Sequence, residues 1–395
     1  MGISLGVVGL GAFGRCFADL FKAHPLVDRI AICDREPERM KPYADKESWR
    51  DKFDPRDCYP SLDEILKADL DAVAIITQPW LHAPQAVRAM EAGVNVYSAV
   101  PILCVPDGDE ILEWCDRLVR TAEKTGMRYM LGETTCFRPE AMFCRRMAAA
   151  RAFGDYVYSE GEYFHAFDSP GCDLRRVLEH RLASAAGREW LEMLETYKKR
   201  GATSGPMFYP THSISGPIST MKAHAVKVSC FGQEPISDDP YFGDHQDVFS
   251  NETAIFQMTN GSVMRISEHR ECALGRETFR VYGTLCAFEH SKWIDKFNRE
   301  KNRTLTADEM RDPLPEEVLS AFQAINPESD AYGGHGGSHA YLVHEFVDAV
   351  AGDRHPLVNA WEAVRYMAAG VTAHKSALRD GEVLEVPDWG DAPDS

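Results

Sequence analysis

Six residues near the start of the chain, Gly9-Leu10-Gly11-Ala12-Phe13-Gly14, have the glycine spacing of a loop that binds a dinucleotide. An apolar run typical of a β-strand precedes them, and a helical stretch follows. Gly9 permits a tight turn, Gly11 lets the backbone approach a pyrophosphate, and Gly14 allows close packing of helix on strand. The free N–H groups and the positive dipole end of the helix would bind the phosphate charge. The loop therefore predicts a dinucleotide site.

An acidic residue follows the second apolar run of the chain. Asp34 lies 20 residues past Gly14, at the end of residues 29–33. A carboxylate at this place accepts hydrogen bonds from the adenosine ribose hydroxyls and repels a 2′-phosphate, which favours NAD over NADP. Arg35 leaves NADP open, because its guanidinium could stack on adenine or accommodate a phosphate.

Strand and helix patterns alternate through the first part of the chain, whereas polar and apolar residues alternate in later segments such as 156–165 and 252–258. The first pattern is typical of a parallel sheet with helices on both faces, and the second of an antiparallel sheet. We therefore expect an α/β Rossmann domain with a doubly wound parallel sheet in residues 1–135. An α+β domain with a large, mostly antiparallel open sheet should follow in residues 136–395, and its helices at 340–380 could pack back on the first domain.

Size and charge limit the classes of partner. The chain has 395 residues, 44% of them hydrophobic, and a net charge of −18, which argues against nucleic acid or an anionic membrane as a partner. No apolar stretch reaches the ~20 residues of a membrane span, and the first strand begins too early for a signal peptide. Eleven scattered cysteines without CxxC spacing are typical of reduced thiols in a cytoplasmic protein. An open sheet would leave an apolar face, so we expect a homodimer or higher homo-oligomer.

Ligands of an open α/β sheet bind at the carboxyl ends of its strands. In this sequence those ends carry Thr77-Gln78-Pro79, Ser98-Ala99-Val100-Pro101 and Glu133. Groups from the second domain should complete the site across the crevice.

Thr77-Gln78-Pro79-Trp80-Leu81-His82 resembles the Thr-Pro-Pro-x-x-His turn of the Gfo/Idh/MocA superfamily, named for glucose–fructose oxidoreductase, inositol dehydrogenase and rhizopine catabolism. The resemblance covers essentially the whole chain. Most members carry Glu-Lys-Pro at the next turn, where the lysine assists proton transfer at the substrate hydroxyl. Here that turn reads Ala99-Val100-Pro101, without the lysine. Many members also place an Asp four residues before an active-site His, where this chain has Phe208 before His212.

Within the superfamily, Tyr209-Pro210-Thr211-His212 together with Val100-Pro101 resembles the NAD-dependent glycoside hydrolases typified by α-N-acetylgalactosaminidase. The glycines around His335 and the carboxylate of Glu133 are similar to that branch too. That branch usually keeps a Glu where this chain has Ala99, and no residue identifies an N-acetyl pocket.

The resemblance implies a tightly bound NAD that is recycled in each turnover. A sugar hydroxyl, usually at C3, is oxidised, the C2 proton is removed, the C1 substituent is eliminated, water adds, and the hydride returns. The carboxylate pair of ordinary glycosidases is then unnecessary. The implied catalytic residues are His212 as the base near its ordinary pKa of ~6.5, Tyr209 as a substrate ligand or as the C2 base if its pKa is lowered, and Glu133 as an acid/base or orienting group.

The binding residues implied around this centre fall into two sets, and no metal site is expected. The cofactor set is Gly9, Leu10, Gly11, Ala12, Phe13, Gly14, Asp34, Arg35, Thr77, Gln78, Pro79, His82, Ser98 and Val100. The substrate set is His335, His165 and Arg138. Basic residues within 168–204 could form an anion pocket for a sulfonated or carboxylated sugar, or a solvated helical face; they are Arg175, Arg176, Lys198, Lys199 and Arg200.

Two other functions stay open at this level. One is a sugar or polyol dehydrogenase with net formation of NADH. The other is a non-catalytic NAD-binding sensor, since the usual lysine and aspartate are absent. The sequence leaves the sugar, its anomer and the leaving group undetermined.

Overall fold

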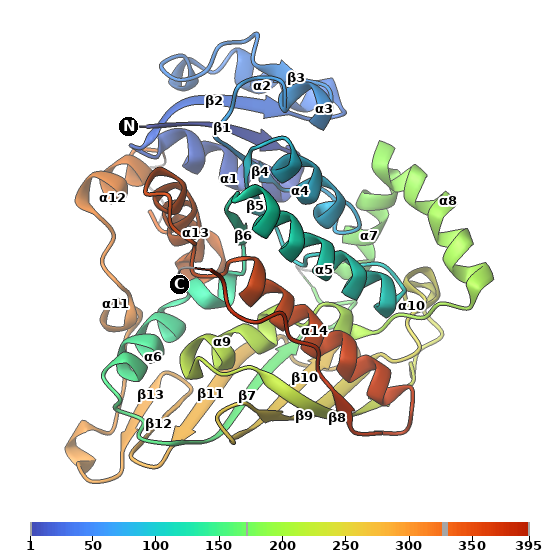
Figure 1. Cartoon of the computed structure of the whole chain (residues 1–395), viewed down its shortest axis with the longest axis vertical. Coiled ribbons are helices and arrows are strands. Elements are labelled where there is room, and N and C mark those ends of the chain that lie inside the picture. The colour runs from blue at the N-terminus through green and yellow to red at the C-terminus, as the bar shows by residue number, and fades with distance from the viewer. Residues whose placement is uncertain (1, 171–172, 326–330, 394–395) are drawn as a thin grey trace.

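A six-stranded parallel sheet is built from the N-terminal third of the chain (Figure 1). The computed structural model describes residues 2–170, 173–325 and 331–393. The strand order is β3-β2-β1-β4-β5-β6, and all neighbours run parallel. The strands are β1 Ile3–Val8, β2 Val27–Cys33, β3 Cys58–Tyr59, β4 Ala72–Ile75, β5 Asn95–Ser98 and β6 Tyr129–Leu131. Their helices are α1 Ala12–Ala23, η1 Pro37–Arg39, α2 Lys41–Ala44, η2 Glu47–Trp49, α3 Leu62–Ile65, α4 His82–Glu91 and α5 Gly108–Thr125.

The second sheet has nine strands in the order β14-β13-β12-β11-β7-β10-β9-β8-β15. Its neighbours are antiparallel except for β7 and β10, which run parallel. The strands are β7 Tyr156–Phe164, β8 Ala225–Gln233, β9 Asn251–Met258, β10 Val263–His269, β11 Arg276–Gly283, β12 Cys286–Glu289, β13 Lys292–Asp295, β14 Arg303–Thr304 and β15 Leu384–Glu385. Together the two sheets confirm the predicted fold class.

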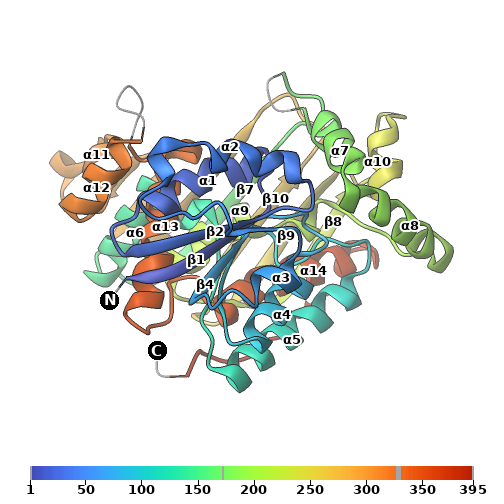
Figure 2. The same cartoon turned by 90° about the horizontal axis from the view of Figure 1, so that it is seen from above.

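Helices of the rest of the chain lie between the two sheets or beside them (Figures 1 and 2). They are η3 Thr134–Phe137, α6 Pro139–Ala149, α7 Leu174–Ala183, α8 Ala185–Arg200, η4 Pro206–Phe208, α9 Thr211–Met221, α10 Pro240–His245, η5 Arg299–Lys301, α11 Ala307–Met310, α12 Glu316–Gln323, α13 Gly334–Ala351 and α14 Ala360–Ala377. Helix α14 packs against both α5 and β8, and α13 packs against both α1 and α6. We keep residue 135 as the proposed domain boundary, because it falls between β6 and β7.

Helix α9 lies buried between the two sheets, and all of its residues are buried. It packs closely on β7, where a Cβ added to Gly161 would lie 1.8 Å from the backbone oxygen of Ser213. The hydroxyl of Ser213 donates a hydrogen bond to the buried carboxylate of Glu268 on β10. These contacts fix the helix start, and with it the neighbouring His212.

We expect Gly161→Ala to move helix α9 away from the sheet. The added methyl has no space, and overpacking of this kind costs about 1–3 kcal/mol of unfolding free energy. The thermal unfolding midpoint should fall, and catalytic turnover should fall with it. Gly275→Ala is the matched control, since nothing lies within 4 Å of a Cβ at that position. Equal midpoints for the two variants would contradict the close packing.

The other face of the second sheet is more charged than the apolar face that we predicted. Neighbouring residues of a strand point to opposite faces, so Glu160 and Glu162 point away from α9. Both carboxylates form ion pairs with Arg265 and Arg280 on the adjacent strands. Exposed apolar side chains such as Ile255 lie scattered among them. Assembly into a homo-oligomer stays a prediction. No helix in the described part of the chain is long and apolar enough to cross a membrane.

Candidate active site

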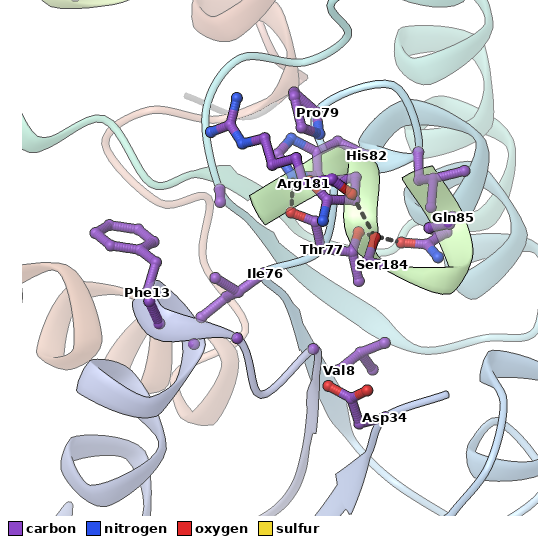
Figure 3. A pocket seen from close by; sticks show the side chains of 18 of the residues that line it. Val8, Phe13, Asp34, Ile76, Thr77, Pro79, His82, Gln85, Arg181 and Ser184 are labelled. Atoms are coloured by element: carbon purple, nitrogen blue, oxygen red, sulfur yellow. Dashed lines mark hydrogen bonds between the residues drawn. The ribbon is translucent and has the colours of Figure 1, made fainter. Parts of the chain in front are cut away.

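A cleft of about 670 Å³ lies at the carboxyl ends of strands β1, β2 and β4, where Val8, Cys33 and Ile76 line it (Figure 3). Its volume is within the range of small-molecule and cofactor sites. Helices α7 and α8 supply part of its wall.

The glycine loop forms one end of the cleft and fits a dinucleotide. A Cβ at Gly14 would lie 1.9 Å from the oxygen of Gly9, so only glycine allows this approach of helix to turn. Gly9 has a φ of +95°, whereas a Cβ at Gly11 would meet nothing within 4 Å. Gly11 is also the N-cap of α1 and provides no side-chain cap. The loop thus combines open space with free N–H donors, as a pyrophosphate requires.

Asp34 joins the loop to the end of β2. Its carboxylate accepts hydrogen bonds from the backbone N–H of Leu10 at 2.7 Å and of Glu36 at 2.9 Å. Asp34 also lines the cleft, where the adenosine ribose of a dinucleotide would lie. Arg35 forms a two-point ion pair with Glu189 of α8, at 2.5 and 2.8 Å. Its guanidinium is therefore engaged by a carboxylate, and the arrangement favours NAD.

The remaining residues of the predicted cofactor set divide into two groups. Ala12, Phe13, Thr77, Gln78, Pro79, His82 and Val100 line the cleft. Leu10 and Ser98 are buried beside it and do not line it. Nδ1 of His82 lies 2.8 Å from the backbone oxygen of Pro101, and Nε2 lies 3.3 Å from that of Thr77. Burial lowers the pKa of His82 to about 4, so the ring is neutral and its one N–H donates to one of these two oxygens.

The structure brings His212 and Glu133 into contact, although they lie 79 residues apart in the chain. Nδ1 of His212 donates to Oε1 of Glu133 at 2.8 Å, and the same oxygen accepts from the N–H of Thr135 at 2.9 Å. Glu133 is fully buried, whereas His212 is 8% exposed and lines the cleft. Across the described residues, no hydrogen bond engages Nε2 of His212. That atom is available to a substrate.

The protonation of His212 differs from the sequence-based expectation of an ordinary pKa. Burial lowers the pKa, but the nearby charges of Glu133 and Glu277 raise it to about 9. For Glu133, burial alone would raise the pKa of the carboxyl group. The charge of His212 outweighs burial and holds this pKa below its usual value. Near pH 7 the pair is therefore an imidazolium and a carboxylate. The ring must lose this proton before it can act as a base.

Tyr209 lies at the same end of the cleft, with its ring centroid 5.5 Å from that of His212. It precedes helix α9, which begins at Thr211 with Pro210 as its N-cap. Its hydroxyl donates to the oxygen of Val100 at 3.2 Å. Burial raises the pKa of Tyr209. The lowered pKa that a role as base requires is not found, and the residue is a neutral hydrogen-bond donor.

The predicted substrate residues are not all at the cleft. His335 lines it with a φ of +53°, and its Nδ1 lies 2.8 Å from Nε2 of His339. Arg138 instead forms an ion pair with Glu277 at 2.5 Å and does not line the cleft. His165 does not line it either, and bonds through Nδ1 to the hydroxyl of Tyr163.

Sequence reasoning missed Tyr163, Glu277 and the part of helix α7 at the cleft. Tyr163 lines the cleft, and Glu277 accepts from the hydroxyl of Thr135 at 2.5 Å. Tyr163 and Glu277 are paired in register on β7 and β11. Alternation along β7 could have indicated Tyr163, since it lies two residues from Gly161 and on the same face of the sheet.

The basic residues predicted as a possible anion pocket do not gather at the cleft. Arg175 pairs with Asp173 and Asp239, and Arg200 pairs with Asp107 and Glu110. Lys198 pairs with Glu195. These contacts favour the solvated helical face.

Ligand atoms of Glu133, His212 and Glu277 lie within 4.8 Å of one another, a spacing that would suit a metal ion. A cation there would stand beside the guanidinium of Arg138 and displace the proton of His212. We therefore expect turnover to stay within twofold after treatment with EDTA, as a chelator titration would measure. Loss of activity that Mg²⁺ or Mn²⁺ restores would contradict this expectation.

The chain is similar in sequence to known proteins. Residues 3–133 match the family model of the Gfo/Idh/MocA oxidoreductases, described as an NAD-binding Rossmann fold. The chain is 24% identical to an alpha-N-acetylgalactosaminidase of Tannerella forsythia, covering 80% of this chain and 70% of that protein. It is also 24% identical to a glycosyl hydrolase family 109 protein of Stenotrophomonas maltophilia, covering 98% and 89%.

Solved structures share the fold over nearly the whole chain. A levoglucosan dehydrogenase in complex with NADH and levoglucosan has a TM-score of 0.73 at 17% identity, covering 98% of this chain and all of that one. A scyllo-inositol dehydrogenase from Lactobacillus casei with NAD(H) and scyllo-inositol has a TM-score of 0.62 at 17% identity, covering 98% and 99%. Residues 3–133, the N-terminal parallel-sheet unit of this chain, are thus similar to the NAD-binding Rossmann domain of the Gfo/Idh/MocA oxidoreductases.

Proposed function

We propose that this chain is an NAD-dependent, sugar-active enzyme that cleaves glycosides by transient oxidation of the sugar. The observation that carries the proposal is the Glu133–His212 pair at the cleft, which Val100 also lines in place of the family's usual lysine. Relatives named as glycosyl hydrolase family 109 proteins support the same reaction class. Oxidation at C3 would acidify the C2 proton, so that the C1 substituent leaves by elimination and water then adds.

The loop of residues 9–14 and Asp34 would hold NAD at one end of the cleft. When bound, NAD supplies a hydride acceptor and later returns the hydride. His212 would hold and move the hydroxyl proton at Nε2, while Glu133 compensates the charge of the ring. The neutral hydroxyl of Tyr209 donates its one proton to the oxygen of Val100 and would accept a hydrogen bond from the sugar.

A panel of aryl glycosides, supplied with and without added NAD, tests the proposal. We expect many equivalents of aglycone per enzyme without matching formation of NADH. Formation of NADH from free sugars would instead support a dehydrogenase, the second candidate, which the sugar dehydrogenases among the structural relatives favour. Tight nucleotide binding with neither signal would support a sensor and contradict both.

A further inference from the structure

Three arginines line the cleft, and two of them are neutralised within the protein. Arg35 pairs with Glu189, and Arg39 pairs with Glu36 at 2.8 Å and lies 3.6 Å from Asp34. Arg181 forms no ion pair with any carboxylate of residues 2–170, 173–325 and 331–393. An uncompensated cation in a cleft is a feature to explain in a chain with a net charge of −18.

Arg181 is held in place by the junction of helices α7 and α8. Its backbone oxygen accepts from the hydroxyl of Ser184 at 2.6 Å and from the N–H of Ser184 at 3.2 Å. Trp190 of α8 stacks on Trp80 of the first domain with ring centroids 4.8 Å apart, which anchors the helix pair over the cleft. The side chain is therefore presented from a fixed backbone.

The guanidinium lies at the end of the cleft away from Asp34. Figure 3 shows Arg181 reaching past Pro79, at the opposite end of the drawn site from Asp34, with the Phe13 loop on another side. Burial raises the pKa of Tyr209, and the charge of Arg181 is the largest influence opposing that rise. Arg181 lines the same cleft as Tyr209 and His212, and it lies away from Asp34 at the adenosine end.

A guanidinium presents a planar fork of donors that matches the paired oxygens of a carboxylate or sulfonate. The dinucleotide has its own phosphate cradle in the glycine loop. We propose that Arg181 recognises an acidic group of the sugar, so that the preferred substrate is a glycoside of a carboxylated or sulfonated sugar. This inference rests on the proposed function for the identity of the reaction. The negative charge of the substrate is inferred from the unpaired guanidinium of Arg181.

The test compares acidic and neutral glycosides in wild type and in Arg181→Met. The probes are 4-nitrophenyl glucuronides and galacturonides with the matching glucosides and galactosides, in both anomers. We expect wild type to prefer the acidic member of a pair at least tenfold in kcat/KM. Arg181→Met should lose about 10- to 100-fold on the acidic member, the size of a charged hydrogen bond, and stay within threefold on the neutral one. Arg181→Lys should restore part of the loss.

Two further measurements separate this role from others. Arg176→Met, on the exposed side of the same helix and outside the cleft, is the matched control and should change neither substrate. The Kd for NAD, measured by quenching of protein fluorescence, should be the same in wild type and Arg181→Met. A weakened Kd for NAD, or equal losses on acidic and neutral glycosides, would overturn the proposal.

A binding experiment keeps the inference independent of turnover. NAD-loaded protein is titrated calorimetrically with D-glucuronate, D-galacturonate and 6-deoxy-6-sulfo-D-glucose, and with the matching neutral sugars. We expect at least one acid to bind tenfold more tightly than its neutral counterpart, and only when Arg181 is present. No preference for any acid would contradict the role of Arg181 even if glycosides are cleaved. Preferential binding without cleavage would support that role and contradict the proposed reaction.

Discussion

Replacing His212 by Ala is expected to reduce glycoside turnover by about 10²- to 10⁴-fold, the usual contribution of a positioned acid or base. The ring lines the cleft and has an Nε2 free to contact the substrate, while Glu133 holds Nδ1 at 2.8 Å. The loop of residues 9–14 is untouched by this change, so NAD should bind as in wild type. Steady-state rates on an aryl glycoside measure the loss of turnover, and the Kd for NAD measures cofactor binding.

The alanine variant also leaves the carboxylate of Glu133 buried without its partner, which destabilises a fold. His212→Asn is therefore measured beside it, because an amide can still donate to Glu133 but cannot carry the proton. A folded asparagine variant that binds NAD and retains near wild-type turnover would remove His212 from the chemistry.

Glu133→Gln is expected to move the pH dependence of kcat/KM to lower pH by one unit or more. Glu133 is the leading cause that raises the pKa of His212 to about 9 against the opposing effect of burial. A base works when it is deprotonated, so the wild-type rate should climb with pH until about 9. Without the carboxylate charge, the ring loses its proton at lower pH, and the rising limb moves with it.

The matched control for this shift is Glu277→Gln. Glu277 lies 3.9 Å from Nδ1 of His212 and is already paired with Arg138, so its removal should move the profile less. An unchanged rising limb in Glu133→Gln would mean that His212 is not the group that titrates.

Local patterns predicted the features that depend on local geometry. The glycine spacing predicted the turn at Gly9 and the close approach of Gly14, and the position of Asp34 followed from the length of one helix and one strand. The alternation of strand and helix patterns predicted the parallel sheet, and the alternation of polar and apolar residues predicted the antiparallel one.

The site itself depends on contacts between distant segments. The rule for strand ends placed Glu133 near the cleft, and the family motif placed His212 there, but neither indicated their ion pair or the pKa that follows from it. Arg138 was predicted to bind substrate; it forms an ion pair with Glu277 of β11 and does not line the cleft, so its role in binding stays a prediction. Arg181 was not singled out from the other basic residues of its segment. Only the fold shows which of these residues form ion pairs with carboxylates.

The most direct test of transient oxidation is cleavage of a glycoside in deuterated water. Elimination after oxidation removes the proton from C2, and the returning proton comes from the solvent. We expect one deuterium at C2 of the released sugar, detected by NMR or mass spectrometry, with no net NADH. A released sugar that keeps its C2 proton would contradict it.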